Sequence, residues 1–313
     1  MSKARIISLC IVLILLCTFG LSSPWVWAAD REDPVTVASK IDTEGALLGQ
    51  MIVLMLRHNG FTVKDKTEFG PTDLIRKAII NGEIDIYPEY TGNGGFFFSN
   101  TDSTLWKDAL KGYETVRELD FKVNRIVWLK PAPANNTWAI AVRKNLSMEE
   151  EITTLEDLAR YVQRGGAVKL AGSEEFVSRP DALPAFEKAY GFHLTKGQLL
   201  VLSGGNTAQT EKAAADGTDG VNFAMAYGTD GSLAALGLKV LEDTKGVQPV
   251  YEPAPIVREF VLKKYPRIRT ILEPVFTSLD LETLQTLNAR IAVEGQMAST
   301  VAEMYLRSKR FLP

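Results

Sequence analysis

Apolar residues recur along residues 34–87 with two alternating periods. Val35 and Val37 share one face of a short β-rich segment, as in a strand. From Leu47 to Leu56 the apolar positions follow helical spacing, and Asp42 or Thr43 precedes them as a cap. The predicted elements are a strand at 34–39, a helix ending by 60, a strand at 61–69, a helix at 74–81 capped by Thr72 or Asp73, and a strand at 84–87. This order predicts a parallel or mixed α/β sheet.

A second α/β pattern follows a proline break at Pro131 and Pro133. Its predicted strands are 138–142, 168–171, 199–202 and 221–227, and its predicted helices are 155–163, 182–190 and 207–215. The flanking sequence predicts a helix at 105–119, a strand at 125–129, extended segments at 239–243 and 250–256, and helices at 257–265, 269–277, 281–291 and 297–309. Two such units joined by extended segments predict two lobes with a ligand cleft between them. We expect lobe one to comprise 29–135 and 242–313, and lobe two 136–241.

The N-terminus has the layout of a secretory signal peptide. Lys3 and Arg5 precede an uncharged apolar run at 6–21, and small residues lead up to Ala28. The apolar run is shorter than the roughly 20 residues that a membrane-spanning helix needs, which argues against a retained anchor. The pattern predicts that residues 1–28 are removed and that the exported chain begins at Ala29.

Cleavage would remove both cysteines, Cys10 and Cys17. The remaining chain could then form no disulfide and no thiolate site, which favours a bacterial periplasm over an animal secretory route. Lipidation of Cys17 is the alternative, but no small residue precedes it. The exported chain would carry 33 basic and 38 acidic residues. That net charge of −5 gives no sign of a nucleic-acid partner.

Signals of enzyme chemistry are poor. The chain has two histidines, His58 and His193, each near a glycine at a predicted helix end. No HExxH, GxSxG or phosphate-loop pattern occurs. The glycines at 92–95 are followed by three phenylalanines and not by the Lys-Ser pair of a phosphate cradle. We therefore expect no catalytic residue, no cofactor and no metal site.

Aromatic residues near predicted strand ends are more informative. A quaternary ammonium group has no N–H to donate, so several aromatic faces hold it best through cation–π attraction. Aromatic residues are found at Tyr87, Tyr90, Trp138, Tyr227 and Tyr251, at strand ends or predicted crossing segments. Because aromatic residues also dominate hydrophobic cores, this pattern alone leaves packing as an alternative.

Several longer motifs narrow the interpretation. They are SKIDTEGALLG at 39–49, GEIDIYPEYTGNG at 82–94, NNTWAIAV at 135–142, EFVSRPDALPAFEKAYG at 175–191, AMAYGTDG at 224–231 and YEPAPIVRE at 251–259. With these motifs the chain resembles the substrate-binding proteins of osmoprotectant ABC importers, which bind glycine betaine, choline or carnitine. PAPANNTW at 131–138 is most similar to the OsmF/YehZ-like branch. The resemblance runs through the whole exported chain and implies a type II periplasmic-binding-protein fold.

The resemblance also implies a ligand site. The four aromatic positions of the family's cage match Tyr90, Trp138, Tyr227 and Tyr251, with Trp in place of the usual Tyr at 138. The family's carboxylate anchor matches Arg179, although the alternative of a structural ion pair stays open. Arginine suits this role because its planar fork can bind a carboxylate through two hydrogen bonds.

Three further positions match the family's site. The family often has Thr where this chain has Asn93, and sometimes Asp where it has Asn136. Neither asparagine is charged, so the cage loses a possible anionic contact to a trimethylammonium group at these positions. This loss argues against tight binding, most strongly for choline, which has no carboxylate for Arg179. Lys40 is expected near the cleft entrance, either touching the ligand or solvated.

The resemblance implies a soluble, monomeric periplasmic protein that closes around a quaternary-ammonium osmolyte and delivers it to a membrane permease. Two alternatives stay open. One is binding of another small zwitterion, whether amino-acid-like or choline-like. The other is an enzyme acting on such a compound, which the missing acid–base pair and nucleophile argue against.

Overall fold

The structure is a computed structural model that describes residues 33–204 and 206–313. The predicted signal peptide at 1–28 and its cleavage site lie outside the described residues. Pro34 to Pro313 form one unit by their mutual contacts. Within the described ranges, no helix combines the length and apolar character needed to cross a membrane.

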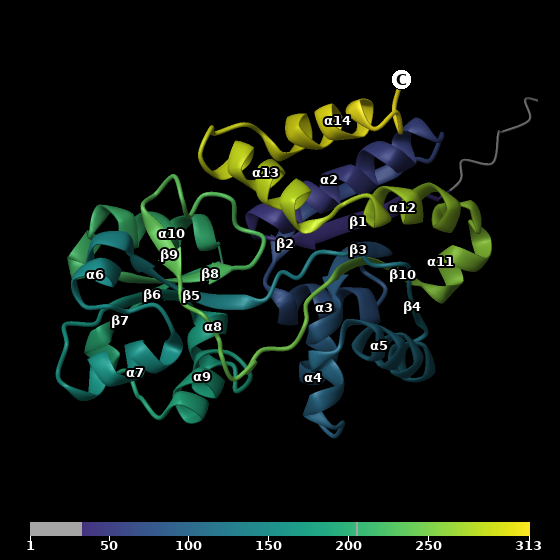
Figure 1. Cartoon of the computed structure of the whole chain (residues 1–313). Helices are drawn as coiled ribbons and strands as arrows, with labels where there is room; N and C mark the ends of the chain where they lie inside the picture. The colour runs from purple at the N-terminus through teal and green to yellow at the C-terminus, as the bar shows by residue number, and fades with distance from the viewer. Residues whose placement is uncertain (1–32, 205) are drawn as a thin grey trace, which may run out of the picture. The chain divides into compact units, whose positions relative to one another are not determined.

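The first sheet, called sheet A, has five strands in the order β2-β1-β3-β10-β4. The strands are β1 (Val35–Lys40), β2 (Val63–Gly70), β3 (Ile86–Tyr90), β4 (Ile126–Trp128) and β10 (Pro253–Arg258). β1 runs parallel to β2 and β3, whereas β10 is antiparallel to β3 and β4. The returning strand β10 therefore lies between β3 and β4, inside a sheet built mainly from the first part of the chain (Figure 1).

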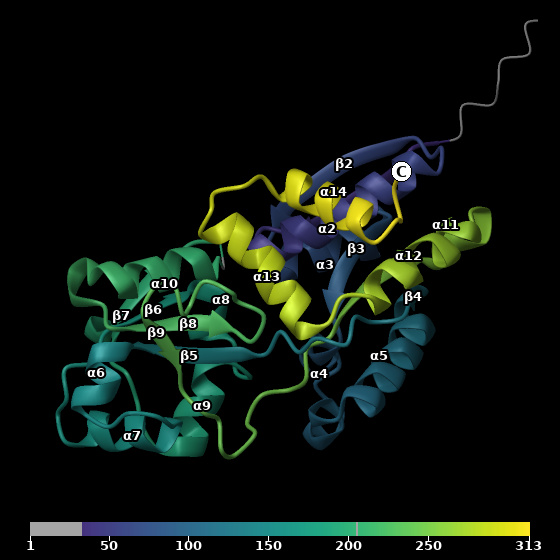
Figure 2. The ribbon, with the colours of Figure 1, turned by 45° about the horizontal axis from the view of Figure 1, so that its top comes forward.

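Helices cover both faces of sheet A. One core contains side chains from α2 (Thr43–His58), α12 (Arg267–Thr277), α13 (Leu281–Ala292) and α14 (Ala298–Ser308). Figure 2 shows the last two of these, in yellow, lying over α2. The opposite core contains side chains from α3 (Thr72–Ile80) and α5 (Ala109–Asn124). The remaining helices around this sheet are the 3-10 turns η1 (Thr91–Asn93) and η2 (Ser103–Lys107) and the short helices α4 (Gly94–Phe97) and α11 (Glu259–Lys264).

The second sheet, called sheet B, has the order β7-β6-β8-β5-β9. Its strands are β5 (Trp138–Arg143), β6 (Leu170–Ser173), β7 (Leu199–Leu202), β8 (Phe223–Tyr227) and β9 (Leu238–Val240). β6 is parallel to β7 and β8, while β5 is antiparallel to β8 and β9. Both sheets are mixed, which is one of the two arrangements that the sequence predicted for the first unit.

Each face of sheet B buries a separate core. On one face lie large side chains from α7 (Leu155–Gln163), α8 (Glu174–Ser178) and α9 (Leu183–Tyr190). On the other face α10 (Thr207–Asp216) packs through Ala213 and Ala214 against strand alanines. The remaining helical pieces are α6 (Lys144–Glu149) and the 3-10 turns η3 (Lys196–Gln198) and η4 (Thr218–Gly220).

Some sequence predictions are wrong in detail. Helix α3 begins at Thr72 with Pro71 at its cap position and no side-chain cap, so neither Thr72 nor Asp73 is the cap. The strand predicted at 84–87 begins later and ends at Tyr90. The helix predicted at 105–119 lies at 109–124, because Asp108 caps it by accepting from the Lys111 N–H.

Candidate functional site

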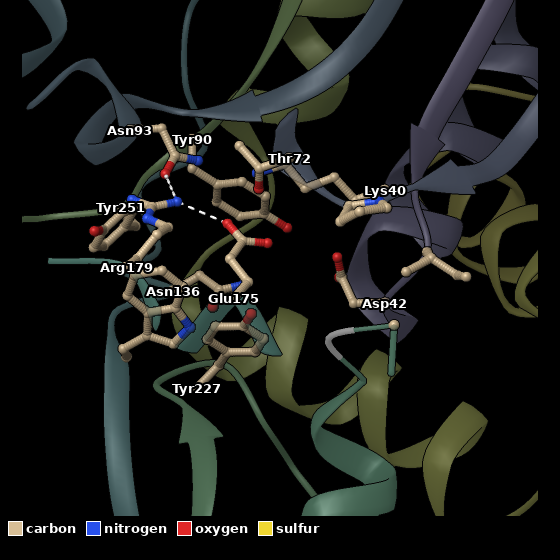
Figure 3. A pocket seen from close by; sticks show the side chains of 14 residues that line it. Lys40, Asp42, Thr72, Tyr90, Asn93, Asn136, Glu175, Arg179, Tyr227 and Tyr251 are labelled. Atoms are coloured by element: carbon tan, nitrogen blue, oxygen red, sulfur yellow. Dashed lines mark hydrogen bonds and ion pairs between the residues drawn. The ribbon is translucent and has the colours of Figure 1, made fainter. Parts of the chain in front are cut away.

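A pocket lies where the carboxyl ends of strands from both sheets come together (Figure 3). It encloses a cavity of about 40 Å³. The residues that line it are Lys40, Ile41, Asp42, Pro71, Thr72, Tyr90, Asn93, Asn136, Trp138, Glu175, Arg179, Gly204, Tyr227 and Tyr251. All eight residues that the family resemblance singled out are among them. Their contributions to binding stay predictions, but the structure brings them to one place.

The aromatic side chains of sheet B are positioned by strand register. Trp138 at the start of β5 is directly opposite Tyr227 at the end of β8, so both side chains point to the same face. Their rings stack with centroids 6.4 Å apart and an interplanar angle of 20°. Phe176 on α8 packs edge-on against Trp138, with centroids 5.9 Å apart. These contacts fix the Trp138 ring before any ligand arrives.

The aromatic side chains of sheet A reach the same pocket. Tyr90 ends β3, and Tyr251 precedes β10, where its ring lies 5.8 Å from that of Trp138. Gly92 permits this placement, since a Cβ there would lie 2.8 Å from the Tyr251 ring. Burial raises the pKa of Tyr90, Tyr227 and Tyr251, so the three phenols stay uncharged at neutral pH.

Arg179 follows α8 and lies against aromatic faces. Its guanidinium carbon is 4.6 Å from the Trp138 ring centroid and 4.1 Å from that of Phe96. Nε and Nη2 donate to the two carboxylate oxygens of Asp181, at 2.9 and 2.6 Å. Nη1 donates to Glu175 at 2.7 Å and to Asn93 at 3.0 Å. Burial works against the charged form, but the hydrogen bonds and charges of its partners outweigh it and raise the pKa of Arg179.

Lys40 is not a solvated side chain. Its Nζ lies 2.7 Å from Oε1 of the fully buried Glu89 and 4.7 Å from the Tyr90 ring centroid. Glu89 also accepts from the Tyr87 hydroxyl, the Tyr90 N–H and the Asn93 amide, at 2.7, 2.8 and 2.7 Å. Burial favours the protonated form of Glu89, but the Lys40 charge and these hydrogen bonds prevail and lower its pKa. Asn93 therefore links this buried ion pair to Arg179.

Glu44 forms a second buried polar cluster beside the pocket. Its carboxylate accepts from the Tyr90 hydroxyl at 3.0 Å, the Asn136 amide at 2.7 Å and the Asn288 amide at 2.8 Å. Burial raises the pKa of Glu44, although the hydrogen bonds from Asn136 and Asn288 oppose the shift. The cluster holds Tyr90 and Asn136 in fixed orientations.

Three buried polar atoms of pocket-lining residues have no hydrogen-bond partner among the described residues. They are Oδ1 of Asn136, Nε1 of Trp138 and the hydroxyl of Tyr251. A buried polar group without a partner costs free energy. The pocket thus combines aromatic faces with an acceptor and two donors that a small polar ligand can use. Nowhere in 33–204 or 206–313 do three metal-ligating side chains gather into a metal site.

The sequence analysis missed two carboxylates of the pocket wall, Asp42 and Glu175. It considered an anionic contact only at Asn93 and Asn136, which are uncharged, whereas the pocket wall contains carboxylates at two other positions. Glu175 lies four residues before Arg179, and the spacing itself was visible in EFVSRPD. The five-residue helix that brings the two side chains together was not predicted. Asp42 was predicted as a helix cap and does accept from the Gly45 N–H.

Residues 33–308 match the family model for the substrate-binding domain of an ABC-type glycine betaine transport system. The chain is 59% identical over 276 residues to the glycine betaine-binding protein YehZ of Escherichia coli (strain K12), covering 88% of this chain and 90% of that one. It is 32% identical over 311 residues to a glycine-betaine-binding protein of Pseudomonas aeruginosa, covering 97% and 94%.

Solved structures agree with the sequence relatives. The structure of ligand-free YehZ from Escherichia coli, 58% identical, superposes with a TM-score of 0.65 over 90% of this chain and all of that chain. The structure of a glycine betaine/carnitine/choline ABC transporter protein, 22% identical, has a TM-score of 0.68 and covers 88% and 99%. These likenesses confirm the predicted α/β fold of the type II periplasmic-binding-protein kind.

Proposed function

Because this chain belongs to the family of substrate-binding domains of ABC-type glycine betaine transport systems, we propose that it captures glycine betaine or a related quaternary-ammonium osmolyte in the periplasm. It then delivers the ligand to a membrane permease. The protein acts as an exported monomer and performs no chemistry on its ligand. The names of its relatives support a transport role, and carnitine is a further ligand of one relative.

The observation that carries this proposal is the meeting of four aromatic side chains in one pocket. Tyr90 and Tyr251 come from the sheet A side, and Trp138 and Tyr227 from the sheet B side. A trimethylammonium group spreads its charge over its methyl groups, so several ring faces in a partly dry pocket suit it. The uncharged phenols and the indole can all present such faces.

Arg179 serves as the carboxylate anchor in this proposal. Its guanidinium already binds one carboxylate on the pocket side, that of Glu175, at 2.7 Å. The unpartnered Nε1 of Trp138 and hydroxyl of Tyr251 are further donors for a ligand carboxylate. Binding of a zwitterion then links residues of the two sheets, which favours closure around the ligand.

A calorimetric panel tests the proposal: glycine betaine, proline betaine, carnitine, choline, ectoine and proline on the exported protein. We expect binding by quaternary-ammonium compounds and weaker or no binding by proline, whose ammonium has N–H donors. Tyr227→Ala should weaken that binding. The matched control is Tyr161→Ala, a buried tyrosine on α7 that does not line the pocket. The proposal is wrong if no quaternary-ammonium compound binds, or if both variants bind as the parent does.

A further inference from the structure

Glu175 occupies the side of Arg179 that a ligand carboxylate would need. It lies on α8, and its side chain is 22% exposed. Figure 3 shows its carboxylate pointing into the pocket, with a dashed line to the guanidinium of Arg179. Asp181, in contrast, does not line the pocket, and it binds Nε and Nη2 through both of its oxygens.

The donors of Arg179 are nearly used up by this arrangement. A guanidinium has five N–H donors, and four of them are engaged by Asp181, Glu175 and Asn93. Both donors of Nη1 are taken, one by Glu175 and one by Asn93. A ligand carboxylate can therefore bind Nη1 only where it replaces Glu175 or Asn93. Asn93 is uncharged and held by Glu89, so Glu175 is the group in direct charge competition with the ligand.

The charged side chains around the pocket also single out Glu175. Lys40 is matched by Glu89 at 2.7 Å, and Arg179 is matched by Asp181 at 2.6 Å. Glu89 and Asp181 are not part of the wall itself. Apart from these two pairs, the pocket wall contains the carboxylates of Asp42 and Glu175, and Glu175 is the one that binds Arg179. Such a charge attracts a trimethylammonium group and repels a carboxylate.

We propose that Glu175 is a specificity-determining residue that competes with the ligand carboxylate for Arg179 and so shifts preference from zwitterions toward net-cationic quaternary-ammonium compounds. The proposal rests on the proposed function, because it assumes that such compounds enter this pocket. It reverses the expectation from sequence that choline binding is weakened most. A zwitterion whose carboxylate binds Nη1 competes with Glu175 for it, whereas a cation without a carboxylate leaves the Glu175–Arg179 pair in place.

The test compares Glu175→Gln with a matched control, Glu174→Gln. Glu174 is the preceding residue on the same helix, is exposed and does not line the pocket. Both changes remove one negative charge and keep side-chain size. Calorimetry with glycine betaine and choline measures the ratio of their affinities, and thermal unfolding confirms that each variant is folded.

In Glu175→Gln we expect glycine betaine to bind roughly fivefold more tightly and choline roughly fivefold more weakly, as suits a partly exposed charge contact. Glu174→Gln should leave the ratio unchanged. Any one of three results overturns the proposal. The affinity ratio is unchanged in Glu175→Gln, both ligands lose affinity equally in Glu175→Gln, or Glu174→Gln shifts the affinity ratio as much as Glu175→Gln does. Each of these results leaves the proposed function standing if the parent binds either ligand. A parent that binds neither overturns both.

Discussion

Replacing Trp138 by alanine should weaken binding of glycine betaine. The Trp138 ring lies within 5.8–6.4 Å of Tyr251, Phe176 and Tyr227, measured between centroids. Each cation–π face contributes ~0.5–2 kcal/mol, which corresponds to a dissociation constant higher by ~2- to 30-fold. The expected loss is near the upper end, because Trp138 also supports the Arg179 guanidinium 4.6 Å from its ring centroid.

The substitution also affects folding. Trp138 is only 6% exposed, and truncating a buried tryptophan commonly costs ~3–5 kcal/mol of stability. Thermal unfolding must therefore accompany the binding measurement. Trp138→Phe keeps an aromatic face and should retain much of the affinity. Tyr161→Ala is the control, because Tyr161 is a buried aromatic residue on α7 that does not line the pocket.

The assay is calorimetry with glycine betaine and with 3,3-dimethylbutyrate, which keeps the shape and carboxylate but lacks the positive charge. Cation–π binding predicts that the parent prefers glycine betaine and that Trp138→Ala narrows this preference. Purely hydrophobic binding predicts the reverse, since the neutral tert-butyl group costs less to desolvate. If the parent bound both ligands equally well, the aromatic cage would be refuted.

Three further predictions follow from the site. Arg179→Ala should weaken glycine betaine binding by ~1.5–3 kcal/mol, the range for hydrogen bonds to charged groups. An unchanged affinity by calorimetry would show that Arg179 is not the carboxylate anchor. Gly92→Ala should weaken binding because its Cβ would lie 2.8 Å from the Tyr251 ring, and a variant that binds like the parent would show that this ring plays no part. The third concerns acid: Glu89 has a pKa lowered below its ordinary value of 4.5 in the folded state. The stability that it gains with Lys40 is present above that ordinary value and is lost as pH falls through the folded pKa. Denaturant unfolding measured from pH 7 to pH 3 should therefore show that the free energy of unfolding falls less steeply in Glu89→Gln than in the parent. Parallel curves of unfolding free energy against pH would contradict this.

Family membership was predictable from sequence because the motifs preserve residue identity in order along the chain. The comparisons confirm the resemblance to glycine betaine-binding proteins. All eight residues that it singled out line the observed pocket. Their direct roles in binding, the lobe boundaries at 135/136 and 241/242, and export after Ala28 remain predictions.

Local elements with strong signals were also predictable. Helix α7 lies at the predicted residues because Thr154 and Asp157 form a capping box and the apolar positions recur with helical spacing. Strand β7 also lies at its predicted residues. In such segments the local conformational preference agrees with the tertiary environment, so a short stretch of sequence is enough to predict the element.

Short helices and the polar network required the tertiary structure. Helix α8 has five residues, too few for a periodic pattern or for stability on its own, so packing of Phe176 decides whether it forms. That helix turns Glu175 toward Arg179. The links from Glu89 to Lys40 and from Asn93 to Arg179 span 49 and 86 positions of the chain. Which buried charges share a pocket depends on long-range strand pairing, and no local pattern specifies it. The sequence alone therefore determined which residue types are available for the pocket. The fold decided which of their charges a ligand meets there.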